Sequence, residues 1–141
     1  MQETRILPQF SDSDALGHIN HLSLIRWYEV ARSPLYRFLF PNFSNVDELL
    51  VLVHMDVDFI SETLLDKESL IRTEITKIGN TSFTMSQEAW QDDRLCGRGS
   101  FVIVYFDLVN RKPLPIDDDF RRKLEYWSNG EQEESARGKT E

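Results

Sequence analysis

The spacing of hydrophobic positions changes along the chain and divides it into an early helix and a later group of strands. From about His21 to Phe38, apolar residues recur at steps of three and four positions, which is the period of an α-helix. After Pro41 the period becomes two, which is typical of a strand with one apolar and one wetter face. The apolar face of this strand is expected to carry Val51, Val53, Met55, Val57 and Phe59.

Three further segments also have strand character, at residues 69–78, 81–90 and 94–107. Short turns containing Gly, Asn or Asp join them, so we expect consecutive antiparallel strands. Residues 117–127 begin with acidic side chains, which favour a helix start, and form a short amphipathic helix. The opening segment at residues 4–10 reads as a short strand at an edge or a bulge, because it contains proline.

This order of elements predicts an α+β fold, in which one long helix is buried against a curved antiparallel sheet of about five strands and a short C-terminal helix follows. Such an arrangement leaves sheet edges and part of one face uncovered, so we expect a homodimer or a homotetramer. Residues 1–127 are assigned to a single domain. Residues 128–141 are polar and charged, and are expected to form a disordered tail.

Length, charge and cysteine content limit the possible classes of protein. A chain of 141 residues suits one domain, and its longest apolar run, Phe101–Phe106, is too short for a transmembrane helix. The N-terminal residues do not resemble a signal peptide, and the single Cys96 cannot form an internal disulfide, so we expect a cytoplasmic protein. The net charge of −8 argues against binding to nucleic acid.

Chemically versatile side chains gather just before the long helix, in a segment rich in turn-forming residues. A helix start presents N–H groups without partners in the helix, and these can stabilise the negative charge that develops on a reacting carbonyl oxygen. A carboxylate nearby can act as a nucleophile or as a general base. Both parts of a hydrolytic site therefore occur within one short stretch, which contains Asp12, Asp14, His18, Asn20 and His21.

The segment DSDALGHINHLSLIRWYEVAR resembles the signature of the hotdog-fold thioesterases related to 4-hydroxybenzoyl-CoA thioesterase, D-x-D-x-x-G-H-V-N-N followed by F-x-E-x-x-R. The segments HMDVDFISE, KIGNTSFT and RKPLPIDDDFRRKL are also similar to this family, so the resemblance covers most of the chain. It implies a hotdog fold and hydrolysis of an acyl thioester, with acyl-CoA preferred over acyl-carrier protein. The only cofactor-like group it implies is the CoA of the substrate.

The resemblance also assigns roles to residues. It makes Asp14 the catalytic carboxylate and the backbone N–H of His21 the oxyanion donor, with Gly17, His18 and Asn20 supporting the loop. A second asparagine is common in the family where this chain has His21, but a backbone donor survives that change. The substrate is expected to contact Trp27, Tyr28 and Phe59 through its acyl group, and Arg98 and Gly99 through its pantetheine arm and phosphates.

Each of these residues also has a structural interpretation. Asp14 could cap the loop, the three aromatic residues could belong to the core, and the glycines beside Arg98 could make room for the helix. Glu29 and Arg32 lie one turn apart and are expected to form an ion pair, with a catalytic Glu29 as the alternative. A zinc site is not expected, because Asp14, His18 and His21 match no standard ligand spacing.

Two other functions remain open. A hotdog hydratase or dehydratase is the first, although that family pattern places Asp and His five positions apart, whereas Asp14 and His18 are four apart. A non-catalytic module that binds acyl thioesters is the second. The sequence leaves open the acyl group, the choice between CoA and carrier protein, the nucleophilic or general-base role of Asp14, and the choice between dimer and tetramer.

Overall fold

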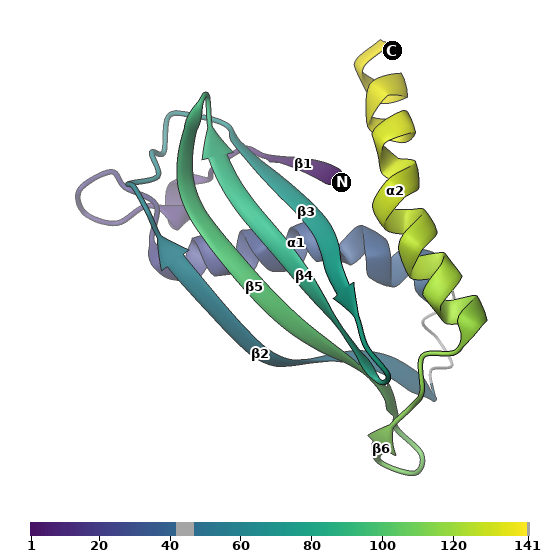
Figure 1. The fold of residues 1–141 in the computed structure, drawn as a ribbon. Coiled ribbons are helices and arrows are strands. Elements are labelled where there is room, and N and C mark those ends of the chain that lie inside the picture. The colour runs from purple at the N-terminus through teal and green to yellow at the C-terminus, as the bar shows by residue number, and fades with distance from the viewer. Residues whose placement is uncertain (42–46, 141) are drawn as a thin grey trace.

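One long helix lies across one side of a curved antiparallel sheet in the computed structural model (Figure 1), which describes the backbone of residues 1–41 and 47–140 and side chains as far as residue 129. The strand order is β1-β3-β4-β5-β2, and a short β6 pairs with β5. The predicted α+β architecture is therefore confirmed. The two-residue β6 and a 3-10 turn at residues 10–12 were not expected, and the first strand covers residues 2–6 instead of the predicted 4–10. The elements are β1 (Gln2–Ile6), the 3-10 turn η1 (Phe10–Asp12), α1 (His21–Leu39), β2 (Glu48–Phe59), β3 (Ser69–Ile78), β4 (Ser82–Gln91), β5 (Arg94–Asp107), β6 (Lys112–Pro113) and α2 (Asp118–Thr140).

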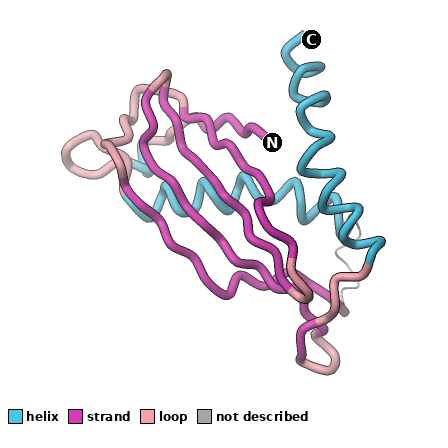
Figure 2. The backbone as a smooth tube through the Cα atoms, in the orientation of Figure 1, coloured by secondary structure: helices cyan, strands magenta, loops and turns pink. Residues whose placement is uncertain are grey.

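The sheet bends around α1 because its long strands contain irregularities. Register shifts occur in β2 between Leu52 and His54, in β3 between Ile75 and Lys77, and in β5 between Leu95 and Gly97, opposite Ala89 and Trp90 of β4. Bulges of this kind increase the local twist and bend the strand that contains them. Figure 2 shows the resulting layer, with the strands on one side of the helix.

The core lies between α1 and the inward face of the sheet. Residues of β4 alternate regularly between buried and partly exposed, as expected for a strand with one face against the core. The helix contributes a buried stripe at three- and four-residue steps, which confirms the predicted period. The largest fully buried apolar side chains of this core are Tyr28, Leu35, Ile71, Phe83, Met85, Phe101 and Ile103, with Leu124 added from α2.

The predicted alternation along β2 is wrong at its centre. Leu52 pairs with Ile103 and Met55 pairs with Phe101, and both partners are buried on the inward face. Paired residues of antiparallel strands share a face, so Leu52 and Met55 face α1 together. The register shift at Val53 places the residues before it on the opposite face of the sheet from the one predicted. The pattern of apolar residues in the sequence does not reveal such an inserted residue.

The expected ion pair between Glu29 and Arg32 is also absent from the described side chains. Arg32 is only 3% exposed and donates to Gln87 Oε1 over 3.0 Å, while its guanidinium lies 4.6 Å from the centre of the Phe101 ring. Gln87 in turn donates to the backbone oxygen of Tyr28 over 2.9 Å. Arg32 is therefore held by the core, whereas Glu29 is exposed.

The C-terminal helix is confirmed, and its backbone continues through residues 128–140, where the sequence predicted a disordered tail. Ser128, at the start of this range, is docked on the domain. Its backbone oxygen accepts a hydrogen bond from the Met1 amino group over 2.5 Å, and its Oγ accepts one from the Ile75 N–H over 3.3 Å. Side chains from residue 130 onward lie outside the described residues, so the domain boundary at residue 127 stays a prediction.

Candidate functional site

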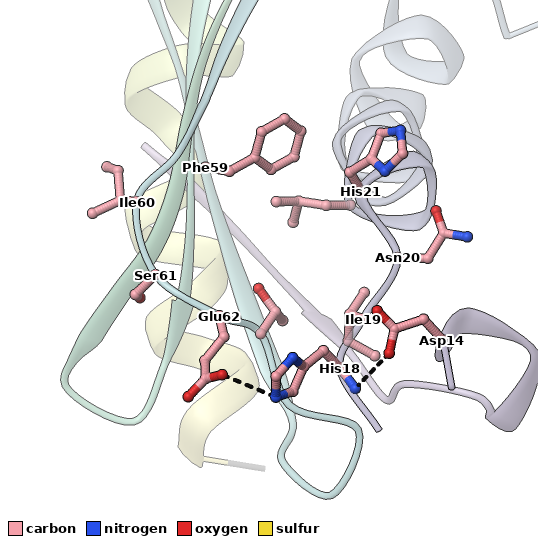
Figure 3. Close-up of a pocket in the computed structure, with 11 residues that line it drawn as sticks. Asp14, His18, Ile19, Asn20, His21, Phe59, Ile60, Ser61 and Glu62 are labelled. Carbon is pink, nitrogen blue, oxygen red and sulfur yellow. Dashed lines mark hydrogen bonds and ion pairs between the residues drawn. The ribbon is translucent and has the colours of Figure 1, made fainter. Parts of the chain in front are cut away.

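The loop before α1 and the segment after β2 enclose a cleft of about 690 Å³ (Figure 3). One wall comes from residues 14–24 and the other from residues 59–63. The sequence predicted five of these residues as parts of one site, and the structure brings them together. The lining residues are Asp14, His18, Ile19, Asn20, His21, Leu24, Phe59, Ile60, Ser61, Glu62 and Thr63.

The Asp14 carboxylate is fixed on one side only. Its Oδ1 accepts hydrogen bonds from the backbone N–H groups of Leu16, over 2.9 Å, and His18, over 3.2 Å. The second oxygen, Oδ2, has no hydrogen-bond partner among the described residues. The structural interpretation of Asp14 as a loop cap is therefore correct for one oxygen, while the other remains available to react.

The loop around Asp14 is shaped by backbone hydrogen bonds and by Gly17. The Asp14 N–H donates to the His18 oxygen over 2.8 Å, and the Gly17 N–H donates to the Asp14 oxygen over 3.2 Å. Gly17 has a φ of 79°, a left-handed conformation that glycine adopts without a steric cost. Gly17 thus supports the loop, as expected, without lining the cleft.

The start of α1 leaves one N–H group free at the cleft. The Asn20 side chain accepts from the Leu22 N–H over 2.7 Å, and the Asn20 backbone oxygen accepts from the Ser23 N–H over 3.0 Å. Among the described residues, no hydrogen bond uses the N–H of His21. This amide lies at the positive end of the helix dipole, where a developing negative charge is favoured.

Asp12 stabilises the loop and is not part of the cleft, although the sequence grouped it with the chemically versatile residues. Its side chain is almost fully buried and accepts from Arg26 over 2.6 Å and from the Gln9 N–H over 2.8 Å. Its backbone oxygen also accepts from the Asn20 N–H over 2.8 Å. Asp12 therefore links the loop to the first turn of α1, and it does not line the cleft.

The opposite wall was largely missed by sequence reasoning. Residues 60–63 follow β2 directly, and Oε2 of Glu62 lies 2.9 Å from Nε2 of His18 (Figure 3). The backbone joins the walls as well, because the Ile19 N–H donates to the Thr63 oxygen over 2.7 Å. The only available signal was the position of Glu62 in the segment HMDVDFISE, which resembled the family but carried no assigned role.

Four of the predicted substrate contacts lie away from the cleft. Trp27 and Tyr28 are buried in the core, and burial, followed by the charges of Cys96 and Glu88, raises the pKa of the Tyr28 hydroxyl. Arg98 lies on the outward face of β5, where its guanidinium is 3.8 Å from Glu88. A Cβ on Gly99 would lie 2.7 Å from the Phe101 ring, so that space is already filled. Phe59 alone lines the cleft, edge-on to the His21 ring.

The neighbouring Gly97 has a structural reason for its small size. A Cβ there would lie 3.0 Å from both Leu24 Cδ2 and the Tyr28 hydroxyl. The small size of Gly97 therefore makes room for α1 against the sheet, as the structural interpretation expected. The passage of the pantetheine arm at Gly99 stays a prediction.

Two further classes of feature are absent from the described part of the chain. No group of three or more His, Cys, Asp or Glu side chains there is arranged to hold a metal ion. Within the same residues, no helix combines the length and the apolar character needed to cross a membrane.

The chain is similar in sequence and in fold to several known proteins. A model of the thioesterase-like superfamily matches residues 8–124. The acyl-CoA thioester hydrolase YbgC of Escherichia coli is 29% identical over 108 residues, which cover 74% of this chain and 81% of the relative. A predicted thioesterase from Bacillus stearothermophilus superposes with a TM-score of 0.82 at 32% identity, covering 88% of this chain and 93% of the other. The probable thioesterase YbaW of Escherichia coli, at 19% identity, supports the fold alone, with a TM-score of 0.81 over 92% of this chain and 100% of the other.

Proposed function

The chain belongs to the thioesterase-like superfamily, and on this premise we propose that it hydrolyses acyl-CoA thioesters, with Asp14 as the catalytic carboxylate and the His21 N–H as the oxyanion donor. One observation carries the proposal. A carboxylate oxygen and a helix N-terminal amide, neither with a hydrogen-bond partner in the part of the chain that the structure describes, border the same cleft. They are seven positions apart in the chain. The similarity to an acyl-CoA thioester hydrolase supports CoA as the carrier.

In the proposed reaction the thioester carbonyl lies at the start of α1, with its oxygen on the His21 N–H. A preorganised donor of this kind typically contributes about 2.7–4 kcal/mol to transition-state stabilisation. Asp14 then either attacks the carbonyl carbon through Oδ2 or removes a proton from an attacking water. The C–S bond breaks and the thiolate leaves readily, so the reaction needs no strong acid at the sulfur.

The acyl group has an apolar surface to contact in the same cleft. Leu24 and Ile19 come from the helix side, while Phe59 and Ile60 come from the end of β2. Phe59 and Ile60 are both about half exposed, so they offer apolar area that a bound acyl chain would cover. This lining supports a predominantly apolar acyl group.

The test is release of free thiol from a panel of aromatic, branched and straight-chain acyl-CoAs, measured for the wild type and for Asp14→Ala. We expect turnover by the wild type and a loss of at least a hundredfold in the variant, because the carboxylate is removed while the oxyanion donor remains. Binding without turnover in the wild type would instead indicate a binding module. Hydration of an enoyl-CoA without thiol release would indicate a hydratase, and faster turnover of acyl-carrier protein would identify a different carrier.

The same proposal includes a homo-oligomer assembled through β2. This strand is the last in the sheet order, and none of its residues is fully buried in the single chain. Its exposed apolar side chains include Leu52, Val53, Met55 and Phe59. A second copy added to this edge would cover these side chains. It would also lie beside the cleft, since Phe59 is part of β2 and also lines the cleft.

Light scattering on purified protein tests this assembly. We expect a dimer or a tetramer for the wild type and dissociation in Val53→Lys, because a charge on a strand edge opposes pairing with another strand. A wild type that is monomeric at the concentrations used for activity would refute it. The cytoplasmic location stays a prediction.

A further inference from the structure

The cleft contains a second carboxylate, Glu62, which contacts a histidine although its side chain is 57% exposed (Figure 3). Glu62 Oε2 lies 2.9 Å from His18 Nε2, and both side chains line the cleft together with Asp14. We propose that His18 is the base that accepts a proton from the hydrolytic water, and that Glu62 is its positioning residue. The inference rests on the proposed function and deepens it, because it assigns Asp14 the role of nucleophile.

A second base is required by the chemistry of a carboxylate nucleophile. When the Asp14 oxygen has bonded to the acyl carbon, its carboxylate is part of a mixed anhydride and no longer accepts protons. The water that completes hydrolysis must then lose its proton to another group. His18 follows Asp14 by four positions, and its backbone N–H already contacts the Asp14 side chain over 3.2 Å.

The contact with Glu62 determines which imidazole nitrogen is available. An ionised carboxylate only accepts hydrogen bonds, so Nε2 of His18 carries the hydrogen that faces Glu62. Nδ1 is then an acceptor, and no hydrogen bond to it occurs among the described residues. A carboxylate behind a histidine also stabilises the imidazolium that forms when the ring takes up a proton.

His21, the other histidine of the cleft, lacks this arrangement. Its ring meets Phe59 edge-on, with the two ring centroids 6.0 Å apart, and no acidic side chain pairs with it among the described residues. Only His18 is therefore both in the cleft and oriented by a carboxylate.

The two chemical steps balance as follows. In the first, Asp14 Oδ2 bonds to the thioester carbon, the C–S bond breaks, and the thiolate leaves with the electron pair and takes a proton from solvent. In the second, water oxygen bonds to the acyl carbon of the anhydride, and its proton passes to His18 Nδ1. The bond between the acyl carbon and Asp14 then breaks, its electron pair returns to the carboxylate, and His18 and the product acid release their protons to solvent.

The alternative role for His18 is that of a clamp between the two walls. The backbone performs that function independently of the ring, because Ile19 donates to the Thr63 oxygen over 2.7 Å and His18 forms a β-bridge with Leu64. Removing the imidazole leaves these contacts, and the N–H bond from His18 to Asp14, in place. The variant His18→Ala therefore separates the chemical role from the structural one.

The experiment follows thiol release by stopped flow with an acyl-CoA that the wild type hydrolyses. For His18→Ala we expect a burst of about one thiol per active site, followed by steady-state turnover about 10²–10⁴-fold slower than the wild type. Added imidazole should accelerate the slow phase. Glu62→Gln should slow the same phase and leave the burst intact. Asp92→Asn is the matched control, because it breaks an exposed ion pair of 2.8 Å with Lys67 away from the cleft, and it should behave as the wild type.

Wild-type kinetics in His18→Ala would overturn the inference, and so would loss of both phases without rescue by imidazole in a variant whose circular dichroism and Tm match the wild type. The proposed function fails differently, through absence of thiol release by the wild type or full activity of Asp14→Ala. Either result would also remove the basis of the inference. An active wild type, an inactive Asp14→Ala and an unimpaired His18→Ala would refute the role of His18 alone.

Discussion

The backbone N–H of His18 donates to Oδ1 of Asp14 over 3.2 Å, so the two oxygens of this carboxylate differ in their contacts. Oδ1 holds the loop, with a second hydrogen bond from the Leu16 N–H. Oδ2 has no hydrogen-bond partner among the described residues, and in the proposed reaction it acts on the substrate. The contact also explains how a side chain on an exposed loop keeps a fixed orientation, since two backbone donors restrain the carboxyl group.

Replacing Asn20 is expected to weaken both the helix start and the site. Its side chain caps α1 through the Leu22 N–H, and losing such a cap typically costs about 1 kcal/mol. We expect Asn20→Ala to lower the free energy of unfolding by about that amount in urea titrations, and to reduce kcat because the His21 amide loses its fixed direction. Asn20→Asp retains an acceptor oxygen and should recover most of the stability. Equal losses in the two variants would contradict the capping role.

Adding one methyl group at Gly97 is expected to destabilise the fold. The Cβ would lie 3.0 Å from Leu24 Cδ2 and from the Tyr28 hydroxyl, and overpacking of this kind costs about 1–3 kcal/mol. The measurement is the free energy of unfolding of Gly97→Ala. Ser100→Ala, on the other face of the same strand, serves as the control and should stay within about 0.5 kcal/mol of the wild type. A Gly97→Ala variant as stable as the wild type would show that the side chains of Leu24 and Tyr28 shift to accommodate the methyl group.

Removing the Tyr28 hydroxyl is expected to stabilise the protein. This oxygen is buried and has no hydrogen-bond partner among the described residues. An unsatisfied buried polar group typically costs about 1–3 kcal/mol, so Tyr28→Phe should raise the free energy of unfolding by a fraction of that cost. Lower stability of the variant at neutral pH would show that the hydroxyl has a partner.

The same residue predicts a pH dependence. Burial raises the pKa of Tyr28 in the folded state, so the folded protein retains the phenol proton more strongly than the unfolded chain does. The contribution of this pKa shift to the free energy of unfolding is complete below the unfolded pKa of about 10 and is lost as the pH rises above that value. Stability of the wild type should therefore fall more steeply above pH of about 10 than that of Tyr28→Phe. Parallel curves for the two proteins would contradict this.

The sequence predicted most of the fold because helix and strand periods are local properties. The period of three to four residues located α1, and alternation located β3, β4 and β5. The prediction of the apolar face of β2 failed at Val53. One inserted residue there moves the residues before it to the opposite face of the sheet without changing the apolar composition. The predicted pairing of Arg32 also failed, because the buried partner Gln87 lies 55 positions away and spacing along one helix cannot reveal it.

The site was predicted where its parts are close in sequence. Asp14, His18, Asn20 and His21 belong to one loop and one helix start, and the structure places all four at the cleft. Glu62 was not found, because its relation to His18 exists only after the end of β2 folds against the loop. Trp27 and Tyr28 were assigned to the substrate because they are large and near the motif, but their direction on the helix places them in the core.

A crystal structure of Asp14→Asn with an acyl-CoA substrate bound tests most directly whether residue 14 and the His21 amide act on the same carbonyl group. We expect the thioester oxygen about 2.7–3.1 Å from the His21 backbone nitrogen, with the carbonyl carbon facing the side chain of residue 14. A thioester bound elsewhere, or one whose carbonyl points away from the start of α1, would contradict this expectation.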